Sequence, residues 1–199
     1  MSNMWDKRYS EKNFFYGTEP NDFLRLNVGR FPVGGRVLTL AEGEGRNAIF
    51  LAKHGFKVTA VDWSEVGLKK LASWAAREGV AVDTVCTDIN QFEFGSNAWD
   101  GIVSIWFHLP SHDRPALYAR CVQALKSKGV FLLEAYTPKQ LNFKTGGPSD
   151  PDMLPNLQEL QNNLAKLQIT SAAEIERDIQ EGEGHRGRSA VVQFLAQKS

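Results

Sequence analysis

The stretch RVLTLAEGEGRNA, residues 36–48, decides the fold of this chain. Its first part, residues 36–41, is short, apolar and bounded by glycines, which predicts a buried strand. Over residues 47–54 apolar side chains recur on one face at helical spacing, which predicts a helix. Between the two segments, Gly43 and Gly45 permit positive φ and let a ligand approach the backbone closely. The stretch therefore predicts a strand, a ligand-binding loop and a helix.

The same alternation of strand and helix continues along the chain. Further strands are predicted at residues 57–61, 82–86, 101–106 and 129–135, and further helices at residues 64–79 and 113–126. Apolar strands that alternate with helices favour a parallel sheet covered on both faces. We therefore predict an α/β fold with a Rossmann-like, doubly wound and mostly parallel sheet.

The pattern changes after the fifth predicted strand. Residues 138–155 contain a pair of glycines and four prolines, which predicts a long, lid-like loop. Residues 157–167 then predict a helix. Residues 173–179 and 189–195 predict two strands joined as in a hairpin, so we expect the end of the sheet to be antiparallel.

Composition narrows the class of protein. The 199 residues are 42% hydrophobic and 23% charged, which is typical of a globular protein and predicts one domain over residues 1–199. Lys+Arg and Asp+Glu both number 23, and this zero net charge removes the simplest argument for a nucleic-acid or membrane partner. There is no apolar run of transmembrane length and no apolar core of a signal peptide, and Cys86 and Cys121 form neither a disulfide framework nor a metal pattern. We expect a cytoplasmic protein without a bound metal.

Charge indicates which ligand the glycine loop takes. The spacing of Gly43, Gly45 and Ala48 also fits the fingerprint of dinucleotide-binding proteins. A pyrophosphate requires bare backbone amides, however, and the carboxylates of Glu42 and Glu44 would repel it. S-adenosylmethionine carries a sulfonium and an ammonium and no phosphate, so an acidic loop suits it. The alternative is a tight turn that binds no ligand.

Two more acids follow predicted strands. Asp62 ends the second strand, where a carboxylate can accept hydrogen bonds from both hydroxyls of a ribose. Asp88 follows the third strand, where a carboxylate can accept from the amino group of adenine, while Ile89 and Trp63 flank the ring. For Asp88 the alternative is an ordinary turn or helix-capping acid. Together these residues predict a nucleoside site at the carboxyl ends of the strands.

The chain resembles the class I S-adenosylmethionine-dependent methyltransferases, and it looks most like the small bacterial group around the tellurite-resistance and thiopurine methyltransferases. The resemblance covers nearly the whole chain and rests on the N-terminal WDxRY and YGxxP stretches, the glycine loop, Asp62, Asp88, the strand WDGIV and the turn LKxKG. The chain departs from the first motif of the family, because Thr39, Ala41 and Glu42 replace its usual aspartate, first glycine and cysteine. The resemblance implies a seven-stranded sheet with an antiparallel last strand and S-adenosylmethionine as the cofactor. It also implies that Glu42 faces the ammonium in place of the missing aspartate.

The residues expected to bind this cofactor come from an N-terminal cap segment, residues 1–30, and from the ends of the strands. In the cap segment Arg8 and Tyr16 can close over the cofactor, and the alternative for them is an ordinary contact between a cation and aromatic rings. The predicted cofactor-binding set is Arg8, Tyr16, Glu42, Gly43, Glu44, Gly45, Asn47, Asp62, Trp63, Asp88, Ile89 and Trp106.

Catalytic residues are harder to predict, because the methyl is already activated and the protein mainly aligns the nucleophile and excludes water. A base helps only where the acceptor carries a proton. The candidates at the strand ends are His108, Glu134 and Tyr136. The alternative for His108 is a turn or capping role, and a buried Glu134 would need a partner. Whether His185 and Arg186, before the last strand, contact the substrate stays open.

The sequence thus predicts a methyltransferase that acts on a small-molecule acceptor, which the resemblance suggests is a thiol or a metalloid. We expect no nucleic-acid or membrane partner, and a monomer or a homodimer. One alternative is an NAD(P)-dependent oxidoreductase, which the acidic loop disfavours. A second alternative is a non-catalytic sensor that binds S-adenosylmethionine.

Overall fold

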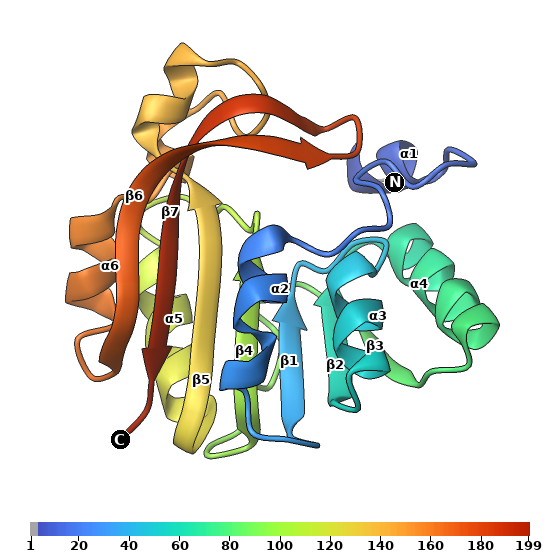
Figure 1. The fold of residues 1–199 in the computed structure, drawn as a ribbon, viewed down its shortest axis with the longest axis horizontal. Helices are drawn as coiled ribbons and strands as arrows, with labels where there is room; N and C mark the ends of the chain where they lie inside the picture. The colour runs from blue at the N-terminus through green and yellow to red at the C-terminus, as the bar shows by residue number, and fades with distance from the viewer. Residues whose placement is uncertain (1–3) are drawn as a thin grey trace.

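The computed structural model describes residues 4–199, whose strands form one seven-stranded sheet (Figure 1). The strands are β1 Arg36–Leu40, β2 Lys57–Asp62, β3 Val82–Cys86, β4 Trp99–Ile105, β5 Leu125–Tyr136, β6 Gln168–Glu181 and β7 His185–Gln197. Their order in the sheet is β3-β2-β1-β4-β5-β7-β6. The first five run parallel, whereas β7 is antiparallel to both of its neighbours. The predicted mostly parallel sheet with an antiparallel last strand is confirmed.

Two groups of helices cover the two faces of this sheet. The α-helices are α1 Met4–Tyr9, α2 Asp22–Asn27, α3 Arg46–Lys53, α4 Glu65–Glu78, α5 Arg114–Ala124 and α6 Leu157–Asn163, and the short 3-10 helices are η1 Val28–Arg30, η2 Pro138–Asn142 and η3 Pro151–Met153. Apolar side chains of α2, α3 and α4 form one core with the sheet. Those of α5 and α6 form a second core with it. The doubly wound arrangement follows, because each face of the sheet is buried by its own helices.

Local signals place the helix ends. The Ser64 hydroxyl accepts a hydrogen bond from the Gly67 N–H at 3.1 Å and so caps α4, and Gly79 ends that helix in the left-handed conformation. Asn21 caps α2 in the same way. The helix predicted over residues 157–167 is shorter and ends at Asn163.

The last hairpin is longer than its sequence predicts. Glu181 pairs with His185 across the ladder, so only residues 182–184 form the turn. The predicted connection of residues 181–188 is therefore mostly strand. Charged and glycine residues continue the ladder here because β6 lies at the edge of the sheet with one side open to solvent. The hairpin arches over the carboxyl ends of the parallel strands toward α1 (Figure 1).

The parallel strands end together at one edge of the sheet. The register places Leu40 beside Val61 and Ser104, and Asp62 beside Cys86. The loops that follow these strands therefore begin at nearly the same level, which is where ligands bind in such sheets. Among residues 4–199 no helix is long and apolar enough to cross a membrane.

Candidate active site

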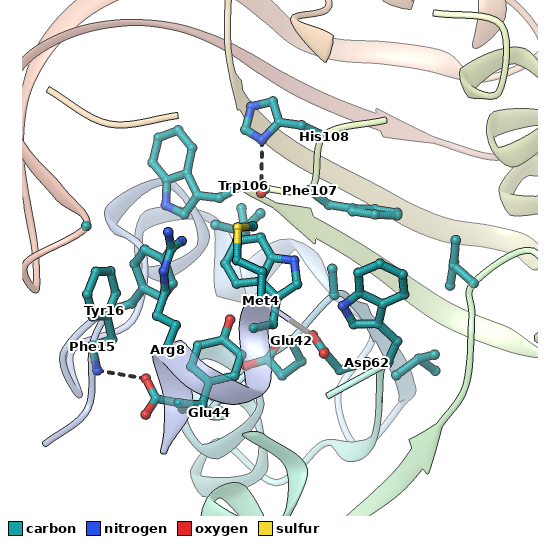
Figure 2. Close-up of a pocket in the computed structure, with 18 of the residues that line it drawn as sticks. Met4, Arg8, Phe15, Tyr16, Glu42, Glu44, Asp62, Trp106, Phe107 and His108 are labelled. Carbon is teal, nitrogen blue, oxygen red and sulfur yellow. Dashed lines mark hydrogen bonds between the residues drawn. The ribbon is translucent and has the colours of Figure 1, made fainter. Parts of the chain in front are cut away.

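A cavity of about 740 Å³ lies at the carboxyl ends of the parallel strands. Its walls come from α1 and the segment after it, from the loops that follow β1 to β4, from the loop before α6 and from the tip of the last hairpin. Eleven of the twelve residues predicted to bind the cofactor line it, and Gly43 is the exception. Figure 2 shows the labelled side chains gathered around this space. The residues predicted to bind the cofactor therefore lie around one cavity.

The glycine loop turns sharply from β1 into α3. Gly45 has a φ of +98°, and a Cβ at this position would lie 2.3 Å from Cγ of Leu71. Both the backbone conformation and the packing of α4 against the loop therefore require glycine at Gly45. Ala41 takes a φ of +50°, a strained conformation for a residue with a side chain.

Glu42 lies over the N-terminus of α3. Its Oε1 accepts hydrogen bonds from the N–H groups of Asn47 at 3.0 Å and Ala48 at 2.8 Å. Burial raises the pKa of Glu42 to about 7, although the hydrogen bond from Ala48 opposes the shift. Glu42 is thus a cavity-lining carboxyl that titrates near neutral pH.

Glu44 has a different role from the one that the sequence suggested. Its Oε1 forms an ion pair with Nζ of Lys70 at 2.6 Å, and its Oε2 accepts from the N–H of Phe15 at 2.8 Å. The charge of the Glu44 carboxylate is therefore balanced by Lys70. The same carboxylate joins the N-terminal segment to the glycine loop through the N–H of Phe15 (Figure 2). The acidic character of the cavity rests on the other carboxylates.

Asp62 is held rigidly at the end of β2. Its two carboxylate oxygens accept from the N–H groups of Gly43 and Ser64, each at 2.8 Å. Burial raises the pKa of Asp62, and the hydrogen bond from Ser64 is the largest opposing effect. The neighbouring Trp63 is 54% exposed beside the cavity. A carboxylate oxygen can accept a second hydrogen bond, so Asp62 can still bind a ligand hydroxyl.

Asp88 is a turn acid that also lines the cavity. Its Oδ1 accepts from the N–H of Asn90 at 2.8 Å, which is the behaviour of a turn acid. Asp88 and Ile89 follow β3, and Trp63 follows the neighbouring strand β2, so all three residues line the same end of the cavity.

The N-terminal segment forms part of the wall. Nη1 of Arg8 donates to the hydroxyl of Tyr16 at 2.7 Å, and its guanidinium lies 4.7 Å from the ring centroid of Trp5. The hairpin tip closes the same side, because the N–H of Glu183 donates to the carbonyl of Phe15 at 2.8 Å. Arg8 and Tyr16 thus both line the cavity, and Arg8 makes the cation–aromatic contact that was the alternative prediction.

A buried network that sequence reasoning missed lies behind this wall. Glu181 accepts from Arg46, Arg177, Asn21 and the indole of Trp106. The network holds Trp106, which has a φ of +55°, in a conformation that aromatic residues rarely adopt. No local signal predicts these contacts, because they join residues far apart in the sequence.

His108 does not fit the predicted role of a base. Its Nδ1 bonds to the carbonyl of Trp106 at 3.0 Å (Figure 2). Its Nε2 accepts from the N–H of Tyr136 at 3.1 Å. Burial lowers the pKa of His108 to about 4, so the ring is neutral. With both nitrogens bound to backbone, His108 fits the turn role that was its alternative.

Glu134 and Tyr136 lie outside the cavity, so neither is placed to act on a substrate there. Glu134 is fully buried, and it accepts from Nε of Arg177 at 2.7 Å and from Asn21 at 2.7 Å. The hydroxyl of Tyr136 bonds to Nδ1 of His185 at 2.8 Å. The prediction fails because the last hairpin covers the end of β5.

His185, like His108, lines the cavity. Its ring lies between Tyr16, at 4.6 Å, and Trp106, at 4.9 Å between centroids. Burial, together with nearby arginines, lowers the pKa of His185 well below its usual range. Its Nε2 forms no hydrogen bond within the described part of the chain. Arg186 does not line the cavity.

Comparisons with known proteins agree with this architecture. Residues 37–129 match the profile of a family described as a methyltransferase domain. No curated protein matches the sequence. The fold is similar to that of TehB from Haemophilus influenzae, with a TM-score of 0.72 and 20% identity over 100% of this chain and 67% of that one. It is also similar to an S-adenosylmethionine-dependent methyltransferase from Methanosarcina mazei, with a TM-score of 0.68 and 15% identity over 90% and 98% of the two chains.

A third solved structure, from work described as "Conversion of a Disulfide Bond into a Thioacetal Group during Echinomycin Biosynthesis", has a TM-score of 0.79 to this chain. Its identity is 16%, and the match covers 100% of this chain and 92% of that one. At such low identity these structures establish the fold alone.

Proposed function

We propose that this chain is a class I S-adenosylmethionine-dependent methyltransferase and that it transfers the methyl group to a small molecule held in the cavity; the match of residues 37–129 to a methyltransferase domain supports the proposal. The observation that carries the proposal is the enclosure of the cavity by the N-terminal segment and the hairpin tip, which meet between Phe15 and Glu183. Of the predicted cap segment, residues 1–30, the first three lie outside the described residues; residues 4–30 would act as a cap and residues 138–155 as a lid over the acceptor. Such an enclosed site suits a small acceptor better than a nucleic acid or a protein.

The residues present fit S-adenosylmethionine. Asp62 would hold the ribose hydroxyls, and Trp63 and Ile89 would flank the adenine. Glu42 would face the ammonium, since its carboxyl lines the cavity and forms no ion pair among residues 4–199. The hydroxyl of Thr39, buried and without a hydrogen-bond partner in this part of the chain, is a further polar group beneath the loop. When bound, the cofactor supplies a methyl activated by a sulfonium.

The acceptor half of the cavity is built around His185. If Nδ1 donates its proton to the hydroxyl of Tyr136, the free Nε2 can accept a hydrogen bond from the acceptor and so align it. Bound S-adenosylmethionine would supply the activated methyl, and the proton of a thiol acceptor would leave to water, because the lowered pKa of His185 makes its ring a weak base. The neighbouring ring of Trp106 limits water and aligns the acceptor.

A thiol is the acceptor class that we favour, because it ionises readily enough to react without a strong base, and the neutral ring of His185 can accept its hydrogen bond. A metalloid oxyanion is the second class, and it needs no base. The protein is proposed to act in the cytoplasm, as a monomer or a homodimer.

Two measurements test the proposal. Calorimetric titration should show binding of S-adenosylhomocysteine and no binding of NADH, and the opposite result would support the oxidoreductase instead. A labelled-methyl assay with thiols, metalloid oxyanions and fractionated cell extract should reveal an acceptor. Binding without transfer to any fraction would favour the non-catalytic sensor.

A further inference from the structure

Arg114, the first residue of α5, lies buried between three segments of the chain. Its Nε and Nη2 donate to the two carboxylate oxygens of Glu159 on α6, at 2.6 and 2.8 Å. Its Nη1 donates to the carbonyl of Leu109 at 2.7 Å and to the carbonyl of Asp152 at 2.6 Å. All three nitrogens of the guanidinium therefore bind to other parts of the protein.

The two carbonyls belong to segments that line the cavity, although Arg114 itself does not line it. Leu109 lies in the loop after β4, and Asp152 precedes Met153 in the lid segment, residues 138–155. The N–H of Ser111 donates to Oδ2 of Asp152 at 3.1 Å, which is a second contact between the same two segments. Arg114 thus joins one end of the lid segment to the loop after β4.

The other end of the lid segment lies on His185. Gly146 has a φ of +141°, and a Cβ at this position would lie 2.8 Å from the hydroxyl of Tyr136 and 3.0 Å from Nδ1 of His185. The carbonyl of Gly146 accepts from Nε2 of Gln140 at 3.1 Å, and Oε1 of the same buried side chain accepts from the N–H of Ala190 on β7 at 2.8 Å. The lid segment is therefore attached to β7 at this end.

Between these two attachments the lid segment forms one wall of the cavity. Its lining residues carry no charge, and they are Gly146, Gly147, Pro148 and Met153. The wall runs from His185, which we place beside the acceptor, to the loop after β4. Its shape therefore depends on both attachments, and Arg114 provides the one next to Met153.

Arginine is the residue that this junction requires. A planar guanidinium can bind both oxygens of a carboxylate and still present a third nitrogen to two carbonyls, which the single ammonium of a lysine cannot do. A buried ion pair is often no more stabilising than apolar residues of the same volume. The pair of Arg114 with Glu159 is therefore better explained by the arrangement that it fixes than by the stability that it adds.

We propose that Arg114 is a positioning residue for methyl transfer, which holds the lid segment against the loop after β4 and so fixes the wall that aligns the acceptor. The inference rests on the proposed function, because it takes the lid side of the cavity as the acceptor side. Arg114 acts through the carbonyls of Leu109 and Asp152, so it touches neither the acceptor nor the cofactor.

Arg120, on the same helix, supplies a matched comparison. Its Nη1 donates to the carbonyl of Ile89 at 3.1 Å, and its Nη2 donates to the carbonyl of Phe92. Ile89 lines the cavity beside the position proposed for the adenine. Two arginines of α5 thus hold loops at different parts of the cavity, and their substitution should affect different steps.

The test compares Arg114→Lys with Arg120→Lys by amide hydrogen exchange in the presence of S-adenosylhomocysteine. We expect residues 146–153 of Arg114→Lys to exchange faster than those of the wild type while residues 87–92 are unchanged, and Arg120→Lys to show the reverse. By calorimetric titration, the affinity of Arg114→Lys for S-adenosylhomocysteine should stay within about twofold of the wild type. With benzenethiol as the probe acceptor, kcat/KM of Arg114→Lys should fall about tenfold, because the wall no longer aligns the acceptor.

Glu159→Gln separates positioning from packing. This variant keeps the hydrogen bonds of Arg114 to the two carbonyls and weakens the contact between α5 and α6, so we expect a lower melting temperature with kcat/KM for benzenethiol unchanged. An equal loss of transfer in Glu159→Gln and Arg114→Lys would overturn the inference, as would unchanged hydrogen exchange over residues 146–153 in Arg114→Lys. If the wild type binds no S-adenosylhomocysteine or methylates no thiol, the proposed function is wrong, and hydrogen exchange of the ligand-free proteins still tests the role of Arg114.

Discussion

The indole Nε1 of Trp106 donates a hydrogen bond to Oε2 of Glu181 at 2.5 Å, across 75 positions of the sequence. The same carboxylate oxygen accepts from Arg46, the first residue of α3. One buried carboxylate therefore connects the end of β4, the glycine loop and the last hairpin. Because Trp106 and the loop both line the cavity, the geometry of the site depends on this long-range network.

Glu181→Gln should destabilise the protein strongly. The amide keeps the shape but leaves Arg46 buried without its ion pair, and the loss of one partner from such a pair costs about 3 kcal/mol. Urea unfolding of the ligand-free protein measures this free energy. Arg188→Gln, which removes an exposed ion pair with Glu176, is the control and should change stability by less than about 1 kcal/mol. Similar small effects for both variants would contradict the role given to Glu181.

Asp62→Asn should weaken the binding of S-adenosylhomocysteine by about 1–3 kcal/mol, because the carboxylate no longer accepts charge-assisted hydrogen bonds from the ribose. Calorimetric titration gives the affinity directly. Asp83→Asn, on the exposed part of β3, should bind as the wild type does. An Asp62 variant with unaltered affinity would remove this residue from the cofactor site.

Glu42 should make stability depend on pH. Its pKa rises from about 4.5 to about 7 on folding, so the folded state binds the proton more tightly than the unfolded state does. The protonated carboxyl therefore contributes to the free energy of unfolding below pH 4.5, and this contribution is lost as the pH rises to 7. The loss is at most about 3 kcal/mol. Unfolding of the wild type and of Glu42→Gln at pH 5 and pH 8 should show the variant gaining relative stability at the higher pH. A constant difference between the two proteins would contradict the shift.

His185→Gln should lower methyl transfer to a thiol by about tenfold, as expected for the loss of a hydrogen bond that aligns the acceptor. Affinity for S-adenosylhomocysteine should stay within about twofold, because we place His185 on the acceptor side. The defect should be the same at all pH values, because the thiol ionises to water without help from this weakly basic ring. A defect that shrinks at high pH would contradict this role and indicate that His185 removes the proton.

Local patterns were sufficient to predict the strand–loop–helix unit around Gly45 and the position of Asp62 at the end of β2. Hydrophobic periodicity and glycine placement depend on neighbours in the sequence, so they predict elements and the edge where the ligand binds. The same reasoning predicted that His108, Glu134 and Tyr136 lie near that edge, but it did not predict which way their side chains point. A side chain at a strand end can face the cavity or pack beneath it, and its neighbours in sequence do not distinguish the two.

The sequence alone therefore determined the fold class, the edge of the sheet where the cavity lies and the acids that end the strands, since each follows from short-range spacing. Only the tertiary structure decided which polar groups remain available to a ligand. Glu134 lies 43 positions from Arg177, and Tyr136 lies 49 positions from His185. Burial makes an unpaired charge or hydroxyl costly, so the folded chain pairs Glu134 and Tyr136 with these distant residues. Glu42 and His185 remain in the wall of the cavity.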